Sequence, residues 1–339
     1  MTRSTPDVVV LRENTEGLST RAYADTLSET LPEHDVRHAS TPAEERRLLK
    51  EAPVATGVSI DEGLLAEANE LQLFVAASSG CNHLPVEAMN DRGVILANAA
   101  GIHAPGIAEQ ALGYVLTFAR GLHTGYQRKA NNEWRHYKAD ELTGSTVTVV
   151  GLGAIGTEFV QRLQGMGVDT IGIRYTPEKG GPTDEVVGFD EESVHDALAR
   201  TDYLVLSTPL SDTTRELVGE AELNTLSPGA YVINVSRGAI VDTDALLAAV
   251  QKEDIAGAAM DVTDPEPLPP DHPFWRMGNV LITPHMGGHT PKHWDRLADV
   301  VATNVRRLEA GRTDELRNQV NDPVETETAT PFSPGADGT

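Results

Sequence analysis

The segment TVTVVGLGAIGTEFVQRL, residues 146–163, constrains the fold of this 339-residue chain more than any other stretch. A short apolar run leads into three glycines, and a helix-like run follows them. Gly151 allows a tight turn, Gly153 lets the backbone approach a bound group, and Gly156 lets the helix pack on the strand. The first turn of that helix presents unpaired backbone N–H groups, which favour an anion. The segment therefore predicts a strand–loop–helix unit that binds a pyrophosphate, and a glycine-rich turn without a ligand is the alternative.

Short apolar runs alternate with helix-like stretches on both sides of this segment, a rhythm typical of βαβ units with a parallel sheet. The first hundred residues contain four such runs, DVVVL, VATGV, LQLFVAAS and GVILANA. A long helical stretch, APGIAEQALGYVLTFARGLHTGYQRKA, leads to six more, TVTVVG, DTIGIRY, YLVLSTP, AYVINVS, IAGAAMDV and NVLITPH. Six candidate strands predict a complete doubly wound sheet in the second half.

The amphipathic stretch HWDRLADVVATNVRRLEAG predicts a helix that returns to the first domain. We therefore expect an α/β protein with two doubly wound parallel-sheet domains. The first domain is discontinuous and comprises residues 1–98 and 289–325, and the second comprises residues 99–288. Residues 326–339 are rich in Thr, Pro and Gly and are expected to form a flexible tail.

The charge balance is strongly acidic, with 51 acidic residues against 27 basic ones and a net charge of −24. Such a surface repels nucleic acid and anionic membranes, so neither is an expected partner. It also repels itself at low salt, whereas molar salt shortens the Debye length to about 3 Å and screens the repulsion. Because basic charge is mostly arginine, the composition indicates a salt-adapted protein; an ordinary acidic protein is the alternative.

Cys81 is the only cysteine, which excludes an internal disulfide framework and a multi-cysteine metal site. No group of residues has metal-ligand spacing, so no metal is expected. The N-terminal residues contain no apolar leader, and no apolar run approaches the roughly 20 residues that a membrane span needs. We therefore expect a soluble, cytoplasmic protein.

Arg174 ends the apolar run DTIGIRY, which follows the glycine loop. An acid at this strand end would bind the ribose hydroxyls of NAD and repel a 2′-phosphate, whereas an arginine can pair with that phosphate. Tyr175 and Thr176 offer a stacking face and a hydroxyl donor. The pattern predicts NADP as the cofactor, and a surface arginine without a ligand is the alternative.

Three further motifs, NVSRGAIVDTDAL, AAMDVTDPEPLP and LITPHMGG, follow predicted strands at the edge where ligands bind in doubly wound folds. With GLGAIG and STPLSDTTREL they resemble the D-2-hydroxyacid dehydrogenases over nearly the whole chain. The resemblance implies a Rossmann cofactor domain inserted in a flavodoxin-like substrate domain. Arg174 and MDVTDPEPLP are most similar to the NADPH-preferring glyoxylate and hydroxypyruvate reductases.

The resemblance also implies three catalytic residues. Arg237 in SRG matches the arginine that binds the substrate carboxylate and polarises its carbonyl, and His285 in TPH matches the general acid/base. Glu266 in DPEP matches the acid that orients this imidazole. Reduction of a 2-oxo acid needs such a set, because negative charge develops on the carbonyl oxygen as hydride arrives. Taken singly, each residue also has a structural explanation, as a surface ion pair, a solvated carboxylate or a core imidazole.

The family pattern further implies contacts with NADP, or with NAD as the weaker alternative, including an acid near the nicotinamide carboxamide. The expected cofactor-binding residues are Gly151, Gly153, Ala154, Ile155, Gly156, Arg174, Tyr175, Thr176, Thr208, Pro209, Thr213, Val235, Asp261 and Gly287.

Two segments resemble family elements that contact the substrate or a second subunit. In ASSGCNHLP, backbone N–H groups of the matching loop bind the substrate carboxylate, so Ser79, Gly80 and Cys81 are candidate contacts. The family commonly carries an acid near Asn82, and its absence leaves the detail of this loop open. NNEWRHYKADELTG resembles an arm that passes between the subunits of a dimer, so a homodimer is expected. Trp134 either closes the partner's substrate pocket or anchors the interface.

The sequence thus predicts an NADP-dependent D-2-hydroxyacid dehydrogenase that works mainly as a reductase of small 2-oxo acids. One alternative is an NAD-dependent member in which Arg174 is idle. A formate dehydrogenase is another, but Glu266 argues against it. The alternative from a different class is a nucleotide-sensing binding protein that acts as a corepressor, and the acidity of the chain argues against work at DNA.

Overall fold

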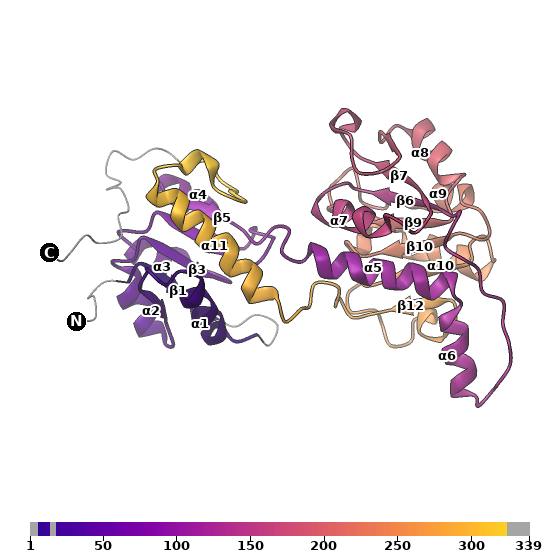
Figure 1. The fold of residues 1–339 in the computed structure, drawn as a ribbon, viewed down its shortest axis with the longest axis horizontal. Helices are drawn as coiled ribbons and strands as arrows, with labels where there is room; N and C mark the ends of the chain where they lie inside the picture. The colour runs from indigo at the N-terminus through magenta and orange to yellow at the C-terminus, as the bar shows by residue number, and fades with distance from the viewer. Residues whose placement is uncertain (1–5, 14–17, 324–339) are drawn as a thin grey trace. The chain divides into compact units, whose positions relative to one another are not determined.

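The computed structural model describes residues 6–13 and 18–323, and the tail expected at 326–339 lies outside them. The chain divides into two compact units (Figure 1). The first comprises Met1–Ile102 and Pro291–Thr339, and the second comprises His103–Thr290.

The first unit is built on a five-stranded sheet with the strand order β2-β1-β3-β4-β5, and all of its pairings are parallel. This is the flavodoxin-like order of a doubly wound sheet. The strands are β1 (Val8–Val10), β2 (Val36–His38), β3 (Val54–Gly57), β4 (Leu73–Ala76) and β5 (Ile95–Ala97). The helices are α1 (Thr20–Thr30), α2 (Pro42–Leu49), α3 (Glu62–Glu67), α4 (Val86–Asp91) and α11 (His293–Glu309), with a 3-10 turn, η4 (Thr313–Glu315).

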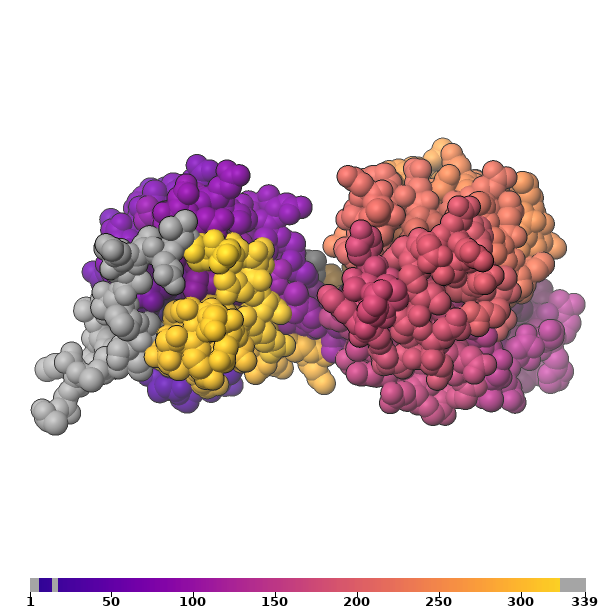
Figure 2. All heavy atoms as spheres, turned by 90° about the horizontal axis from the view of Figure 1, so that it is seen from above, coloured from indigo at the N-terminus to yellow at the C-terminus, as the bar shows by residue number. Residues whose placement is uncertain are grey.

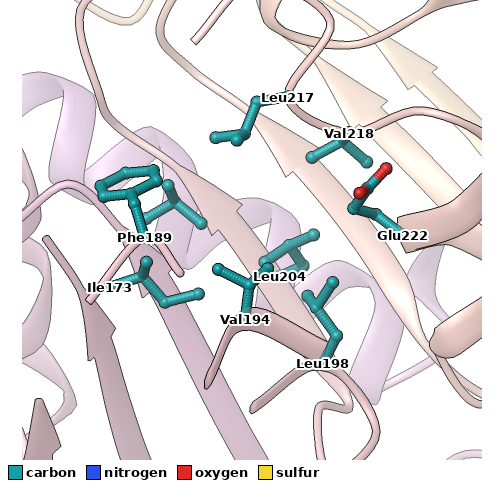
Figure 3. A pocket seen from close by; sticks show the side chains of 9 residues that line it. Ile173, Phe189, Val194, Leu198, Leu204, Leu217, Val218 and Glu222 are labelled. Carbon is teal, nitrogen blue, oxygen red and sulfur yellow. The ribbon is translucent and has the colours of Figure 1, made fainter. Parts of the chain in front are cut away.

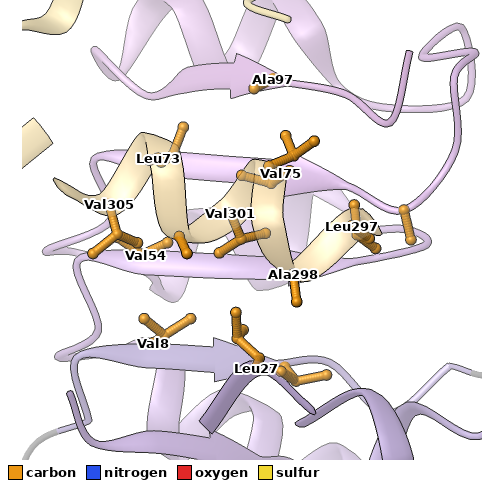
Figure 4. Packing of buried hydrophobic residues seen from close by; sticks show 14 of the residues in the cluster. Val8, Leu27, Val54, Leu73, Val75, Ala97, Leu297, Ala298, Val301 and Val305 are labelled. Carbon is orange, nitrogen blue, oxygen red and sulfur yellow. The ribbon is translucent and has the colours of Figure 1, made fainter. Parts of the chain in front are cut away.

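Helices cover both faces of this sheet. Leu297, Ala298, Val301 and Val305 of α11 pack with Leu27 of α1 against the central strands (Figure 4). Helices α2, α3 and α4 bury their apolar side chains against the opposite face. Figure 2 shows the C-terminal segment in yellow among the N-terminal residues in purple. The first unit is therefore completed by a helix from the far end of the chain.

The second unit contains a seven-stranded sheet with the order β12-β11-β10-β9-β6-β7-β8, again with only parallel pairings. Counted from β6, its first six strands follow the Rossmann order 3-2-1-4-5-6, and β12 extends the sheet by one strand. The strands are β6 (Thr146–Val150), β7 (Asp169–Ile173), β8 (Glu185–Val187), β9 (Tyr203–Leu206), β10 (Tyr231–Asn234), β11 (Gly257–Met260) and β12 (Val280–Ile282).

Two groups of helices cover this second sheet. Side chains of α5 and α7 share one apolar cluster with the sheet, and those of α8, α9 and α10 share another. The helices are α5 (Ala104–Ala119), α6 (Leu122–Ala130), α7 (Ala154–Leu163), α8 (Glu191–Leu198), α9 (Glu220–Thr225) and α10 (Thr243–Gln251). Three 3-10 turns are η1 (Pro177–Lys179), η2 (Gly238–Ile240) and η3 (Pro273–Arg276). The prediction of two parallel-sheet α/β domains is confirmed.

Local details differ from the sequence-based expectation in three places. The edge strands β2 and β8 were not expected, because VRH and EVV are short and only partly apolar. The second sheet therefore has seven strands rather than six. The long helical stretch before the glycine loop breaks at Gly121, whose φ of +60° is left-handed and ends α5 before α6 begins.

Candidate active site

The glycine loop joins the end of β6 to the start of α7. Gly151 has a φ of +95°, and a Cβ there would lie 2.8 Å from the backbone of Thr208, so only glycine fits the turn. A Cβ on Gly156 would lie 2.0 Å from the carbonyl oxygen of Gly151, because helix and loop touch at this point. A Cβ on Gly153 would meet nothing within 4 Å. The loop is thus tight on its protein side and open above Gly153, where a ligand can approach the N-terminus of α7.

A cavity of about 490 Å³ opens beside this loop, at the carboxyl ends of β6, β7 and β9. Its volume falls within the roughly 300–1,000 Å³ of small-molecule sites. Eight of the expected cofactor-binding residues line it, namely Gly151, Gly153, Arg174, Tyr175, Thr176, Thr208, Pro209 and Thr213. Six other residues line it as well, namely Leu152, Lys179, Phe189, Ser211, Thr214 and Leu217.

The lining of this cavity carries two positive side chains, Arg174 and Lys179, and no carboxylate. Arg174 follows the last residue of β7, and its Nη1 donates to the carbonyl oxygen of Gly180 at 2.5 Å. That bond holds the guanidinium at the strand end. In a chain with a net charge of −24, a cavity that gathers cations and excludes acids favours an anionic ligand.

A second, much smaller cavity shares Phe189 and Leu217 with the first (Figure 3). Its volume is about 10 Å³, which is at the lower limit for holding one water molecule. Its other lining side chains are apolar except for Glu222, whose Oε2 accepts from the backbone N–H of Gly219 at 3.0 Å. This void is part of the apolar core below the larger cavity, and it has no room for a cofactor.

Arg237 lies just after β10, on a loop that is tied to its neighbours. The Ser236 hydroxyl donates to the carbonyl oxygen of Thr208, and Asn234 Nδ2 donates to that of Arg237 at 2.9 Å. A Cβ on Gly238 would lie 2.0 Å from the Thr263 carbonyl, so this loop packs directly on the loop after β11. The exposed Arg237 guanidinium bonds the Ser236 carbonyl at 2.7 Å. No carboxylate among the described residues pairs with it, which leaves its charge available to a ligand.

His285 and Glu266 form a pair on the neighbouring loops. His285 Nδ1 lies 2.8 Å from Glu266 Oε1, and the two side chains are 51% and 44% exposed. Because a carboxylate accepts hydrogen bonds, Nδ1 carries the proton and Nε2 is the atom left for proton exchange with a substrate. Glu266 Oε2 in turn accepts from the backbone N–H of Thr263 at 3.3 Å. The pair has the geometry of a general acid/base oriented by a carboxylate.

Asp261 lies at the end of β11 and is buried. Its Oδ1 accepts from the Met286 N–H at 2.8 Å and from the Thr283 hydroxyl, and its Oδ2 accepts from the Gly287 N–H at 2.8 Å. Its carbonyl oxygen accepts from the His285 N–H at 2.8 Å. Asp261, expected as a contact of the cofactor, thus binds the loop that carries His285.

The remaining expected cofactor contacts do not line the cavity beside the glycine loop. Ala154 and Ile155 form the first turn of α7, beside Gly156. Val235 is buried in the apolar core between β10 and Ser236, so only its backbone could meet a ligand. Gly287 lies against Asp261 Oδ2.

The expected substrate loop lies in the first unit, after β4. Ser79 and Gly80 are exposed, and a Cβ on Gly80 would meet nothing within 4 Å. The carbonyl oxygen of Ser79 accepts from Asn98 Nδ2 at 2.7 Å, which fixes the loop. The Cys81 side chain is buried in the apolar core, and burial raises the pKa of its thiol. Only the backbone of Cys81 is therefore available for a contact.

Trp134 lies in the second unit, on the extended segment after α6, and its side chain is fully exposed. It lines a groove of about 840 Å³ that is separate from the cavity at the glycine loop. Four cationic side chains line this groove with it, namely Arg120, Arg128, Lys129 and Arg135, and so does Glu133, which pairs with Arg135.

Several residues of the site were not predicted from the sequence. Lys179 follows Arg174 by five positions. Because the chain has only six lysines, a lysine so close to Arg174 could have indicated a second cation at the same site. Thr283 lies two residues before His285. No sequence pattern indicates its role, because that role depends on a contact with Asp261. Gly238 was visible within SRG, but its packing on Thr263 needed the fold.

Residues 6–13 and 18–323 contain no cluster of three or more His, Cys, Asp or Glu side chains that could hold a metal ion. Within the same residues, no helix has the length and apolarity needed to cross a membrane.

The chain is similar to known proteins over most of its length. Residues 112–287 match the family model described as "D-isomer specific 2-hydroxyacid dehydrogenase, NAD binding domain". The chain is 30% identical to the glyoxylate reductase of Thermococcus litoralis, over 73% of this chain and 76% of that protein. It is also 30% identical to the D-3-phosphoglycerate dehydrogenase of Methanocaldococcus jannaschii, over 88% of this chain but only 57% of that longer protein.

A solved structure gives a similar result. The D-isomer specific 2-hydroxyacid dehydrogenase from Xanthobacter autotrophicus Py2, solved in complex with NADPH and MES, is 27% identical and superimposes with a TM-score of 0.75. The match covers 94% of this chain and 98% of that one.

Proposed function

We propose that this chain, which belongs to the D-isomer specific 2-hydroxyacid dehydrogenase family, is an NADPH-dependent reductase that converts small 2-oxo acids to 2-hydroxy acids. The observation that carries the proposal is the bond of 2.8 Å between His285 Nδ1 and Glu266 Oε1. It lies in the same unit as the glycine loop and Arg237, whose guanidinium forms no ion pair with a carboxylate of residues 6–13 or 18–323. A general acid, an anion-binding cation and a dinucleotide loop together are what carbonyl reduction requires.

The residues that line the cavity beside the glycine loop fit NADP. The open space above Gly153 admits a pyrophosphate, and the exposed face of Tyr175 suits stacking against an adenine ring. Arg174 and Lys179 would pair with a 2′-phosphate, and no lining carboxylate would repel it. The NADPH complex of the Xanthobacter relative supports this choice. NAD, which lacks that phosphate, would leave both cations without a counter-charge, so we propose it as the weaker cofactor.

The chemistry divides between the cofactor and the chain. A bound reduced nicotinamide supplies the hydride that reaches the 2-carbon of the substrate. Arg237 binds the substrate carboxylate and draws electron density towards the carbonyl oxygen, where negative charge develops. His285 Nε2–H donates a proton to that oxygen, and Glu266 holds the imidazole through Nδ1 so that the ring keeps its orientation. The product is a 2-hydroxy acid, and His285 regains its proton from solvent.

The loop after β4 is the candidate substrate contact within the first unit. We propose that the backbone N–H groups of Ser79, Gly80 and Cys81 bind a substrate carboxylate, because the first two residues are exposed and Gly80 presents no side chain. The burial of the Cys81 thiol argues against a nucleophilic role, and no step of the reaction needs a nucleophile.

We also propose that the chain forms a homodimer through the segment after α6. A fully exposed tryptophan beside a groove of about 840 Å³ is expected at an interface rather than on a free surface. The lining of that groove carries four cations against one carboxylate, Glu133, and this positive excess would attract a second copy of this acidic chain. Light scattering should give the mass of a dimer, and Trp134→Ala should shift it towards the monomer; an unchanged dimer would remove Trp134 from the interface.

The experiment that tests the reductase proposal is the oxidation of NADPH and of NADH at high KCl concentration. The substrates should run from glyoxylate and pyruvate to branched 2-oxo acids. We expect turnover that favours NADPH. Equal or better turnover with NADH would reject the role of Arg174 and Lys179 while keeping the enzyme class. Folded protein that binds NADPH but turns over no substrate would instead favour a nucleotide-sensing binding protein.

A further inference from the structure

A chain of hydrogen bonds runs from α5 to the loop that carries His285, and the proposed reaction uses none of its first three members. Gln110 Nε2 lies 2.9 Å from the Tyr114 hydroxyl and 3.2 Å from the Thr283 hydroxyl. The Tyr114 hydroxyl bonds the Thr283 hydroxyl, and Thr283 bonds Asp261 Oδ1. Tyr114 and Asp261 are both buried, so water does not compete for these bonds.

The acceptor at the end of this chain sets the direction of every bond in it. Asp261 already accepts two backbone N–H groups, and as a carboxylate it has no proton to give. The single hydroxyl proton of Thr283 must therefore point at Asp261. Tyr114 then donates to Thr283, and Gln110 donates to Tyr114. Burial raises the pKa of Tyr114, so its phenol keeps the proton that this arrangement needs.

The loop at the end of the chain needs such support, because His285 has a φ of +54°. Residues other than glycine rarely adopt this left-handed backbone conformation, and it costs on the order of 1 kcal/mol unless the surroundings hold it. The N–H groups of His285, Met286 and Gly287 all donate to Asp261. Helix α5 also touches the loop directly, since a Cβ on Gly106 would lie 2.9 Å from the Gly287 carbonyl oxygen.

We propose that Tyr114 and Thr283 are positioning residues for His285, which act through Asp261 to hold the imidazole where it can exchange a proton with the substrate. This inference rests on the proposed reductase function. It assigns a role to the face of α5 that meets this loop, in addition to its packing on the sheet. The hydroxyls of Tyr114 and Thr283 bond each other, Gln110 and Asp261, whereas the imidazole bonds Glu266, so the effect passes through the loop backbone.

The test compares Thr283→Val and Tyr114→Phe, which remove one hydroxyl each and keep the shape of the side chain, with Thr283→Ser, which restores the hydroxyl. Two controls lose a hydroxyl elsewhere in the same unit, one that is hydrogen-bonded inside the protein and one at the tip of a tyrosine whose ring is buried. Thr148→Val removes a hydroxyl bonded to Thr201 inside the sheet, and Tyr203→Phe removes one on β9. Each variant is assayed for kcat and for the KM of NADPH. Amide hydrogen exchange at Met286 and Gly287 is measured without cofactor.

We expect kcat to fall about 10- to 100-fold in Thr283→Val and Tyr114→Phe, the scale of a misplaced catalytic group. The KM of NADPH should stay within about twofold, because the cavity at the glycine loop lies on other residues. The amides of Met286 and Gly287 should exchange faster, Thr283→Ser should recover most of the lost kcat, and both controls should match the native chain. Tyr114→Phe, which removes only one oxygen atom, carries the test if Thr283→Val does not fold.

Native kcat and native exchange in both Thr283→Val and Tyr114→Phe would overturn the inference. Equal losses in the two controls would also overturn it, because the effect would then be general destabilisation. If the native chain oxidises neither NADPH nor NADH, the reductase proposal is what fails. The exchange rates of Met286 and Gly287 then decide alone whether the hydroxyl chain holds the loop.

Discussion

His285 combines an exposed ring with a constrained backbone, and this combination suits a proton donor. Its ring nitrogen Nδ1 is fixed by Glu266, while its backbone is held by Asp261. Both of these contacts orient His285, and Nε2 remains available to the substrate. A core histidine would instead be buried with both nitrogens satisfied.

The first prediction concerns this residue. His285→Ala should lower kcat by about two to four orders of magnitude, the usual effect of losing a general acid. The KM of NADPH should change little, because His285 does not line the cavity beside the glycine loop. His195→Ala is the matched control, since His195 also bonds a neighbouring side chain, Thr225, but lies on α8 away from the loops of the site. A His285→Ala variant with native kcat would remove His285 from the mechanism.

The second prediction concerns the two cations of the cavity. Arg174→Asp should raise the KM of NADPH by about 10- to 100-fold, the scale of one lost charged hydrogen bond and one new repulsion. Lys179→Ala should have a smaller effect in the same direction, because the flexible ammonium is exposed. The KM of NADH should change far less in both. Arg200→Asp, at an exposed arginine paired with Glu185, is the control. Equal effects on both cofactors would reject a 2′-phosphate contact.

At the scale of elements, the buried strands and the glycine loop could be predicted, because their apolar runs and spacing are local signals. The edge strands β2 and β8 could not, since an edge strand is covered on one side only and carries polar residues. The break between α5 and α6 was missed for a different reason. Gly121 packs against Tyr137, sixteen residues later, and that contact is absent from the local pattern.

The same distinction applies to the candidate site. Arg237, Glu266 and His285 lie in motifs that the sequence displays. The roles of Thr283 and Tyr114 depend on side chains 169 positions apart that meet only in the folded unit. Asp261 was visible in its motif, but its bonds to the His285 loop required the structure.

The third prediction concerns the contact between the glycine loop and α7. Gly156→Ala places a methyl group 2.0 Å from the Gly151 carbonyl oxygen and should destabilise the second unit by about 1–3 kcal/mol. It should also weaken NADPH binding, because the loop must move away from the helix. Gly113→Ala is the control, since Gly113 lies in α5 with nothing within 4 Å of an added Cβ. That change should stabilise the chain by about 0.5–1 kcal/mol. Urea unfolding measures both, and two equal effects would contradict the packing argument.

At the scale of the whole molecule, negative charge dominates the surface while the proposed ligands are anions. Positive side chains are concentrated in two places, the lining of the cavity beside the glycine loop and the groove near Trp134, and there they offset the negative charge. Over the whole chain, acidic residues outnumber basic ones by 51 to 27. The excess repels itself, and the folded state holds these charges closer together than the unfolded state does.

The fourth prediction follows from this repulsion. The Tm should rise with KCl from dilute buffer to molar concentration, because screening shortens the Debye length from about 30 Å at 0.01 M to about 3 Å at 1 M. Relief of about 3 kcal/mol would raise the Tm by roughly 6 to 12 °C in units of this size. Sucrose at matched osmolarity is the control, since it favours compact states without screening charge. A Tm that does not respond to KCl, or responds no more than to sucrose, would make the acidity incidental to stability. A steep rise specific to KCl would instead mean that the assays of cofactor and substrate need molar salt to report on the folded protein.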